Sequence, residues 1–306
     1  MRAGIVFVAA FAALASSSHS ATAEARDLDD LDGGIEAAPD SESVETRGKY
    51  ILYASGCINC HTARGEEGVA LAGGRALETE FGVFRSPNIT PDFETGIGGW
   101  SLDEFTRALR EGIAPDGSPY YPAFPYTSYA GMRDEDVADL FAYLQALEPV
   151  ERAVPPHELG FPYNIRMSLW PWRWLYFDAE GFVPHREDEE SIARGAYLVN
   201  AMGHCGECHT PRNWLGALQR EHHLAGNPDG PEDRTVPNIT PHHADGIGDW
   251  SRGDLVFFLQ TGFFPDGDVA GGGMGAVIRD NTSKLTEADR DAMVDYLRAI
   301  DPLEDQ

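Results

Sequence analysis

The sequence predicts an all-α protein made of two tandem copies of one helical domain, and two observations support this prediction. Short stretches recur in the same order far along the chain: PNITP begins at Pro87 and again at Pro237, 150 residues later. Each copy also carries the same helix signals, a serine before one helix and acidic residues at the start of another. Because self-similarity at long period indicates repeated structural units, we interpret the chain as a duplication.

The predicted elements follow one order in both copies. A first helix carries a Gly-x-Tyr sequence, which begins at Gly48 in one copy and at Gly195 in the other. A loop-rich middle follows, and then a short helix capped by Ser101 or Ser251. The last helix is predicted from acidic residues in its first turn and from one apolar face. In the first copy this face consists of Val137, Leu140, Phe141 and Leu144.

The segments outside the two copies differ in composition. A charged start, an apolar run and a small-residue site before Glu24 predict a cleaved signal peptide and therefore a periplasmic protein. The acidic stretch that follows predicts a disordered tail. Between the copies lies an aromatic and proline-rich connector, which we expect to pack across both domains. The predicted segments are 1–23 (signal peptide), 24–46 (tail), 47–149 (domain 1), 150–190 (connector) and 191–306 (domain 2).

The charge of the chain limits the partners it can have. Its formal net charge is -27, which argues against nucleic acid and anionic lipid and favours a protein partner with a basic docking face. Solubility alone explains the same excess of acidic residues. After the signal peptide no apolar stretch approaches the roughly 20 residues that a membrane span needs. We therefore expect no membrane span.

All four cysteines fall in two pentapeptides, CINCH from Cys57 and CGECH from Cys205. C-x-x-C-H is the attachment pattern of c-type haem, in which both thiols bind the porphyrin and the histidine binds the iron. Disulfides or a zinc site would use the thiols but would not explain a histidine after each pair. The sequence therefore predicts two covalently bound haem c groups.

These motifs and the repeat resemble two class I cytochrome c domains, in which the first and last helices cross at a glycine. More closely, PNITPDFETGIGGWSLDEFTRALREG and YYPAFPY look like stretches of the cytochrome subunits of membrane-bound alcohol and gluconate dehydrogenases. The resemblance covers nearly all of the chain after the tail. Those subunits usually carry three haems, whereas this chain has two motifs. The resemblance also implies that Trp100 and Trp250 donate an indole hydrogen bond to a haem propionate, and plain core packing is the competing interpretation.

The resemblance places the sixth ligand of the second haem at Met274, with core packing as the alternative. The residue 150 positions earlier is Phe124, which cannot bind iron. We therefore expect the sixth position of the first haem to be vacant or weakly filled, with Met132, Met167 or a tyrosine as alternatives. The residues expected to bind haem are Cys57, Cys60, His61, Cys205, Cys208, His209 and Met274.

Two functions are compatible with these features. The leading one is a periplasmic dihaem cytochrome c that transfers electrons between a dehydrogenase and a downstream cytochrome or oxidase. The alternative is a haem enzyme, peroxidase-like or acting on another small molecule, with an open first haem that the second supplies with electrons. Peroxidase chemistry needs an acid–base group near the iron, and the segment around Phe124 offers tyrosines but no histidine or glutamate.

Overall fold

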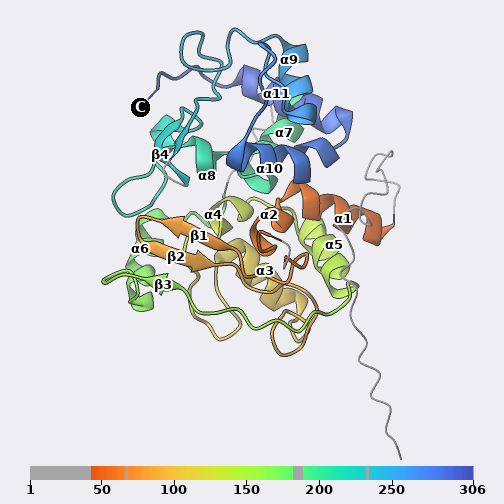
Figure 1. The fold of residues 1–306 in the computed structure, drawn as a ribbon, viewed down its shortest axis with the longest axis vertical. Coiled ribbons are helices and arrows are strands. Elements are labelled where there is room, and N and C mark those ends of the chain that lie inside the picture. Colours follow the sequence, from red (N-terminus) through yellow and green to blue (C-terminus); the bar gives the residue numbers. More distant parts are fainter. Residues whose placement is uncertain (1–42, 66–67, 182–188, 232–233, 306) are drawn as a thin grey trace, which may run out of the picture. The chain divides into compact units, whose positions relative to one another are not determined.

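The computed structural model describes residues 43–65, 68–181, 189–231 and 234–305, which are mostly helical (Figure 1). The predicted signal peptide and nearly all of the predicted tail lie outside these residues. Within the described ranges no helix combines the length and the apolar character needed to cross a membrane. The expectation of an all-α chain is corrected, because three short antiparallel strands form one sheet and two more form another.

The elements recur in the predicted order. The first half contains α1 (Val44–Ala54), α2 (Cys57–His61), β1 (Ala76–Thr79), β2 (Gly82–Arg85), α3 (Leu102–Glu111), α4 (Tyr126–Tyr129) and α5 (Asp134–Gln145). The connector adds β3 (Glu158–Leu159) and α6 (Leu169–Tyr176). The second half contains α7 (Glu190–Tyr197) with a π-helical turn (Leu198–Met202), α8 (Gly206–His209), β4 (Asn227–Gly230), β5 (Arg234–Val236), α9 (Arg252–Thr261), α10 (Gly272–Asp280) and α11 (Glu287–Ala299).

The predicted caps of α3 and α9 are confirmed. The hydroxyls of Ser101 and Ser251 accept a hydrogen bond from the backbone amide three residues on, and the acidic side chain at that position bonds back to the serine amide. Such reciprocal bonds use two amides that the helix cannot pair by itself. Both helices end at a glycine with positive φ, 64° at Gly112 and 80° at Gly262, where a side chain would be strained.

The first and last helices of each half pack closely at a glycine. A Cβ atom added to Gly48 on α1 would lie 2.3 Å from the carbonyl oxygen of Asp139 on α5. One added to Gly195 on α7 would lie 1.9 Å from the carbonyl oxygen of Ala292 on α11. Both distances are far inside van der Waals contact, so the crossing of each helix pair requires a residue without a side chain.

The two halves exchange contacts through the tyrosine of each Gly-x-Tyr sequence. Tyr50 on α1 donates its hydroxyl hydrogen to Asp289 on α11, and Tyr197 on α7 donates to Asp136 on α5 (2.5 Å). The amide that precedes each of these last helices donates to the same tyrosine oxygen, at 3.3 and 3.0 Å. Each half therefore supplies a hydroxyl that satisfies the start of the other half's last helix.

The connector contacts both halves, as expected, but it does not bury its tryptophans. β3 pairs with β2, the indole N–H of Trp172 donates to the carbonyl of Leu215 (2.8 Å), and Arg173 donates to the carbonyl of Glu111. Trp170 and Trp174 are nevertheless 43% and 84% exposed. An eight-residue helix can turn only one face inward, so the remaining aromatic side chains of α6 stay at the surface.

Candidate functional site at the two C-x-x-C-H motifs

The short helices α2 and α8 hold the two motifs. Gly56 precedes α2 with φ 63°, and His204 precedes Cys205 with φ 41°. These left-handed residues turn the chain sharply between the first helix of each half and its motif. None of the four cysteines, all of which lie in the described ranges, forms a disulfide. The two cysteines of a motif are three residues apart, a spacing that places side chains on one side of a helical turn.

Burial makes Cys57 and Cys205 poor thiolates. It raises the pKa of Cys57 and of Cys205 to about 12, and the neighbouring cysteine of the same motif adds to this effect. Disulfide-exchanging enzymes with a C-x-x-C pair instead need a thiol with a lowered pKa. The surroundings therefore do not suit thiol redox chemistry and are compatible with cysteines that serve as attachment points.

The histidine of each motif is oriented by a proline carbonyl. Nδ1 of His61 bonds to the carbonyl oxygen of Pro87 (2.8 Å), and Nδ1 of His209 bonds to that of Pro237 (2.7 Å). A carbonyl can only accept, so Nδ1 carries the proton and the Nε2 lone pair is left for a metal. Burial also lowers the pKa of both histidines, which favours the neutral ring. Neutral imidazoles held in this way fit the role of iron ligands in a c-type haem site.

These bonds explain why PNITP occurs twice. Its asparagine side chain accepts a hydrogen bond from the threonine amide two residues later, as Asn88 does from Thr90 (2.9 Å). Its amide group donates to the segment after the last helix, from Asn88 to the Val150 carbonyl and from Asn238 to the Leu303 carbonyl, both at 2.7 Å. The repeated pentapeptide thus fixes the proline carbonyl that orients each histidine.

The two motifs lie beside each other where the halves meet. The ring of His204 packs against Tyr129 with 5.4 Å between centroids, and a Cβ atom on Gly56 would lie 3.7 Å from His204 Nε2. Across the same junction α10 packs on α2, and α4 packs on the π-helical turn before α8. Burial, Glu207 and the Cys60 thiol of the other half together raise the pKa of Cys208. The two C-x-x-C-H motifs are therefore close neighbours.

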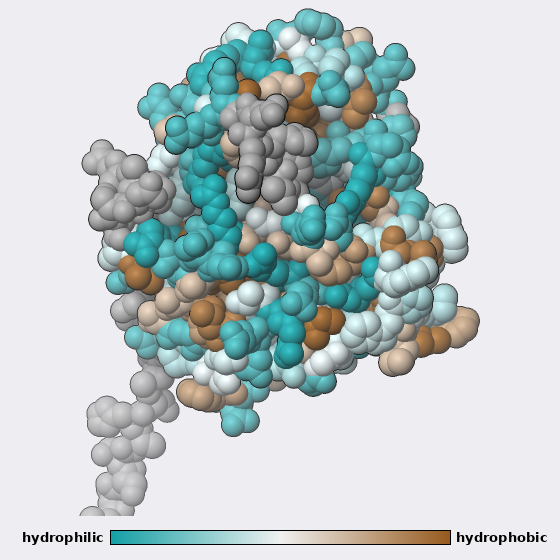
Figure 2. Space-filling model, turned by 180° about the vertical axis from the view of Figure 1, so that it is seen from behind, coloured by the Kyte–Doolittle hydropathy of each residue, from teal (hydrophilic) through white to brown (hydrophobic). Residues whose placement is uncertain are grey.

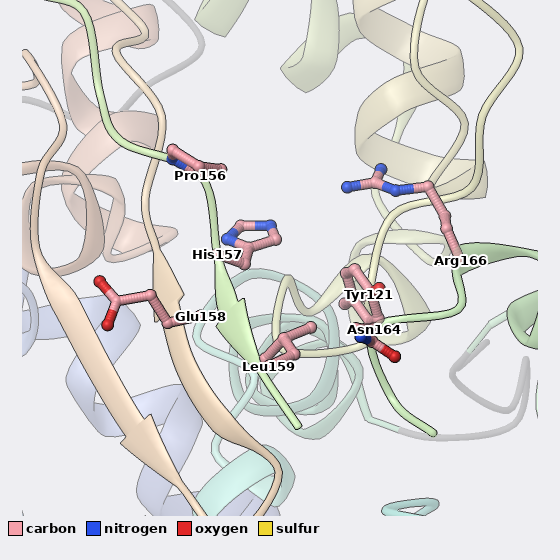
Figure 3. A pocket seen from close by; sticks show the side chains of 7 residues that line it. All are labelled: Tyr121, Pro156, His157, Glu158, Leu159, Asn164 and Arg166. Carbon is pink, nitrogen blue, oxygen red and sulfur yellow. The ribbon is translucent and has the colours of Figure 1, made fainter. Parts of the chain in front are cut away.

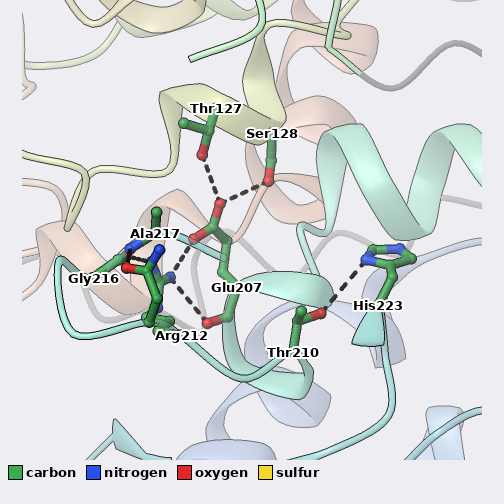
Figure 4. Close-up of polar contacts among 9 residues, drawn as sticks. Thr127, Ser128, Glu207, Thr210, Arg212, Gly216, Ala217 and His223 are labelled. Carbon is green, nitrogen blue, oxygen red and sulfur yellow. Dashed lines mark hydrogen bonds and ion pairs between the residues drawn. The ribbon is translucent and has the colours of Figure 1, made fainter. Parts of the chain in front are cut away.

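Glu207, inside the second motif, joins this site to the first half (Figure 4). Its Oε1 accepts hydrogen bonds from the hydroxyls of Thr127 (2.9 Å) and Ser128 (2.8 Å) on α4. Its Oε2 pairs with Arg212 at 2.5 Å, and the glutamate side chain is only 9% exposed. The corresponding residue of the first motif is Asn59, so the repeat could not have revealed this contact.

The charges around Glu207 keep it ionised. Burial by itself would raise the pKa of this carboxyl, but Arg212, His204 and the two α4 hydroxyls hold it below its usual range. The sequence also favours surface positions for the adjacent His222 and His223, but His223 is largely buried and its Nε2 lies 2.7 Å from the side-chain oxygen of Asn200. Burial, assisted by Arg220, lowers the pKa of His223 to about 4.

Met274 and Phe124 do not occupy the same local structure. The repeat keeps its register up to the hydrogen bonds from Tyr120 to Gly112 and from Ala270 to Gly262, both 2.8 Å. Beyond this point the second half has three additional residues before its last helix, and Met274 lies inside α10. Phe124 lies instead in a turn before α4. The equal spacing of 150 residues is therefore no proof that the two side chains have equivalent positions.

The other candidates for a sixth ligand have different surroundings. Met132 is buried, with 2% of its surface exposed, just before α5, whereas Met167 is 71% exposed on the connector. Tyr129 lies next to the first motif: burial, Cys57 and Cys60 raise its pKa well above the usual value. The Tyr129 hydroxyl donates to the Ser55 carbonyl at 2.7 Å.

Neither Trp100 nor Trp250 has a hydrogen-bond acceptor for its indole N–H among the residues described by the structure. Trp250 packs against the rings of Phe258 and Phe264, at 5.5 and 5.8 Å between centroids. Both expectations for these tryptophans, core packing and a hydrogen bond to a propionate, therefore remain compatible with the geometry.

Comparison with known proteins gives consistent matches. The family model described as Cytochrome c matches residues 45–148. A protein of Cereibacter sphaeroides described as "Diheme cytochrome c-type" is 48% identical over 263 residues, which cover 85% of this chain and 86% of the relative. The fructose dehydrogenase cytochrome subunit of Gluconobacter japonicus is 41% identical over 83% of this chain. The cytochrome c subunit of the quinone alcohol dehydrogenase of Gluconobacter oxydans is 36% identical over 88% of it.

The matched region spans different shares of these relatives. It covers most of the Cereibacter protein, but only 52% of the fructose dehydrogenase subunit and 57% of the alcohol dehydrogenase subunit.

Proposed function

The chain belongs to the cytochrome c family and has a dihaem c-type cytochrome among its relatives, and from this premise we propose that it is a periplasmic dihaem electron carrier. One observation carries the proposal. In both motifs the histidine donates Nδ1–H to a proline carbonyl, at 2.8 and 2.7 Å, so that Nε2 is free for iron beside two cysteines.

The residues that would hold the two haems follow from the motifs. Cys57 and Cys60 attach one haem and His61 binds its iron; Cys205, Cys208 and His209 do the same for the other, with Met274 as its sixth ligand. When bound, each haem supplies one-electron oxidation and reduction. The protein supplies attachment, a neutral histidine of fixed orientation and a buried environment, all of which influence the reduction potential.

Two tandem class I cytochrome c domains, 47–149 and 191–306, account for the architecture. Three features support this assignment. The helices recur in the same order, and a glycine lies at each helix crossing. In both halves an asparagine also donates a hydrogen bond to the segment after the last helix. The Tyr50 and Tyr197 contacts hold the domains together. Because the motifs lie at this junction, an electron has a short route between the two sites.

The partners are a dehydrogenase as donor and a downstream cytochrome or oxidase as acceptor. This rests on relatives that are named as cytochrome subunits of fructose and alcohol dehydrogenases. The net charge of -27 favours a basic face on at least one partner. Location in the periplasm follows from the predicted signal peptide.

A second candidate is a haem enzyme with an open first site. The observation that favours it is Phe124, which stands in a turn of the first half and offers no ligand atom. Its ring packs against Tyr120 and Tyr129, at 5.7 and 5.8 Å between centroids, so the wall on this side is aromatic. Such a wall lacks the acid–base group that peroxide cleavage needs.

The test is to produce the full chain in cells that attach c-type haem and to measure haem per protein after loose haem is extracted. We expect a ratio of two, and a ratio of one for each of the double variants Cys57→Ser/Cys60→Ser and Cys205→Ser/Cys208→Ser. A ratio of one in the unaltered protein would refute the dihaem proposal. Peroxide turnover by the unaltered protein would favour the enzyme instead of the carrier.

A further inference from the structure

One surface of the protein differs from the rest in its exposed apolar side chains. Phe161, Trp174 and Trp214 are 82%, 84% and 80% exposed, and between the first two Met167 and Trp170 are also open to solvent. We call this surface the aromatic face and define it by Phe161, Met167, Trp170, Trp174, Leu175 and Trp214. Exposed aromatic side chains gathered in this way mark interaction surfaces in soluble proteins.

The aromatic face is held in place by contacts on its inner side. The hydrogen bond from Trp172 to the Leu215 carbonyl joins α6 to the loop that carries Trp214. Arg173 donates to the Glu111 carbonyl and lies 4.5 Å from the centre of the Phe177 ring. These contacts fix the segment before any partner arrives, which reduces the entropy lost on binding.

The stretches that form the aromatic face contain arginines but no carboxylates, whereas the chain as a whole is strongly acidic. Asp and Glu outnumber Lys and Arg by 50 to 23, yet no carboxylate occurs between Glu158 and Asp178 or between Glu207 and Glu221. These two stretches contain four arginines, of which Arg212 pairs with Glu207 and Arg220 pairs with Asp178. Among the described residues Arg166 and Arg173 form no ion pair, so they supply the positive charge of the face. In Figure 2 the drawn surface is mostly teal, and white and brown gather at its right-hand edge, on the side where α6 lies.

A pocket of about 540 Å³ opens beside the aromatic face, between β3 and the segment that leads to α6 (Figure 3). His157 and Arg166 project toward it from opposite sides, and Glu158 points away from both. Nδ1 of His157 accepts a hydrogen bond from the Arg85 amide (3.1 Å), so its Nε2 carries a hydrogen that can be donated. The pocket therefore offers two donors to a carboxylate.

The aromatic face is connected to segments that adjoin both candidate haem sites. Arg166 donates to the Pro119 carbonyl (3.2 Å), and Arg173 lies 5.2 Å from the ring centre of Tyr126. These contacts reach the segment that contains Phe124. On the other side, Trp214 follows His209 by five residues. A partner bound here would be close to both sites.

We propose that the aromatic face is the docking surface for the electron-donating dehydrogenase, which binds through an apolar patch with a carboxylate that enters the pocket beside Arg166 and His157. This rests on the proposed function. Charge complementarity selects a protein of this kind, because a net charge of -27 repels anionic lipid and two copies of this face would place Arg166 and Arg173 against the same arginines of the other copy. We expect a basic electron-accepting protein to bind the rest of the surface, which is acidic.

The test uses the full haem-loaded chain and membranes of the bacterium that makes it, with fructose, gluconate or ethanol as reductant. Trp170→Ser/Trp174→Ser should lower the rate of haem reduction by the dehydrogenase at least about tenfold, since exposed tryptophans dominate many interfaces. Reduction by ascorbate should be unchanged, because both side chains point to solvent. The matched control is Phe93→Ser, an aromatic residue outside the face that is about as exposed as Trp174 (78% against 84%).

A photo-cross-linker in place of Trp174 should capture a dehydrogenase subunit, and one in place of Phe93 should not. A double variant that is reduced at the unaltered rate would overturn the proposal, as would cross-links only to lipid, to a second copy or to an oxidase. If the unaltered chain carries two haems but no substrate reduces it, the proposed donor is wrong as well. If it carries no haem, the proposed function itself fails.

Discussion

Glu207→Gln tests whether the second motif is fastened to the first half by a buried charge. The substitution keeps the size of the side chain and one carbonyl oxygen, but it removes the negative charge that pairs with Arg212 at 2.5 Å. The amide oxygen can still accept from one or both hydroxyls of Thr127 and Ser128. The change therefore isolates the contribution of the ion pair.

The expected loss is about 2–3 kcal/mol. Removing one partner of a fully buried ion pair costs about 3–5 kcal/mol, because the other charge is left uncompensated. Here Arg212 is 29% exposed and also donates to the Gly216 carbonyl (2.7 Å), so solvent and this bond reduce the cost. At roughly 2–4 °C per kcal/mol for a protein of this size class, the melting temperature should fall by about 4–12 °C.

The assay is urea unfolding of the haem-loaded protein at several pH values. The folded pKa of Glu207 lies below its usual 4.5, so the carboxylate stabilises the fold above about pH 4.5 and loses this effect as the pH falls through the folded pKa. The difference in unfolding free energy between the variant and the unaltered protein should therefore shrink as the pH falls. Glu221→Gln, at an exposed position, is the control. A difference within about 0.5 kcal/mol at pH 7 would refute the reasoning.

Three further predictions follow from the same geometry. Met274→Ala should lower the potential of one haem only, because loss of an axial thioether lowers haem potential; spectroelectrochemistry that finds both haems unchanged would place the ligand elsewhere. Tyr197→Phe should cost about 1–3 kcal/mol in urea unfolding, because it leaves Asp136 and the amide before α5 without their partner; a neutral result would show that the exchanged contact is dispensable. The pKa of His223 is about 4 in the folded protein and 6.5 in the unfolded chain, so on acidification the unfolded chain takes up this proton at a higher pH than the folded protein does. The free energy of unfolding should therefore fall by up to about 3 kcal/mol as the pH drops from 6.5 to 4. His223→Gln should flatten this part of the pH profile of unfolding, and an unaltered slope would contradict the assignment.

Local signals in the sequence predicted the helices, their caps and the two motifs. A serine cap depends on the residue three positions later, and the cysteine pair and its histidine lie within five residues. The glycines at the helix crossings were also predictable, because the repeat showed them twice in the same place. What these features share is that the interacting atoms are close in the chain or are marked by the duplication.

Phe124 and Met274 show where the sequence repeat no longer predicts equivalent positions in the structure. Three additional residues in the second half fall within this segment, so one side chain lies in a turn and the other in α10. Equal spacing along the chain cannot distinguish these conformations, because a short insertion is absorbed by local changes in backbone geometry. The sixth ligand of the first haem stays a prediction for the same reason.

The sequence by itself determined the internal repeat, the two C-x-x-C-H motifs and a mostly helical framework. Only the tertiary structure decided that Tyr50 and Tyr197 cross between the halves, that Glu207 bonds to α4, and that Trp170 and Trp174 of α6 face outward. These outcomes depend on residues separated by 61 to 239 positions and on which face of a helix is covered. No local pattern encodes such information, because it arises only when the free energies of all contacts are satisfied together in the folded chain.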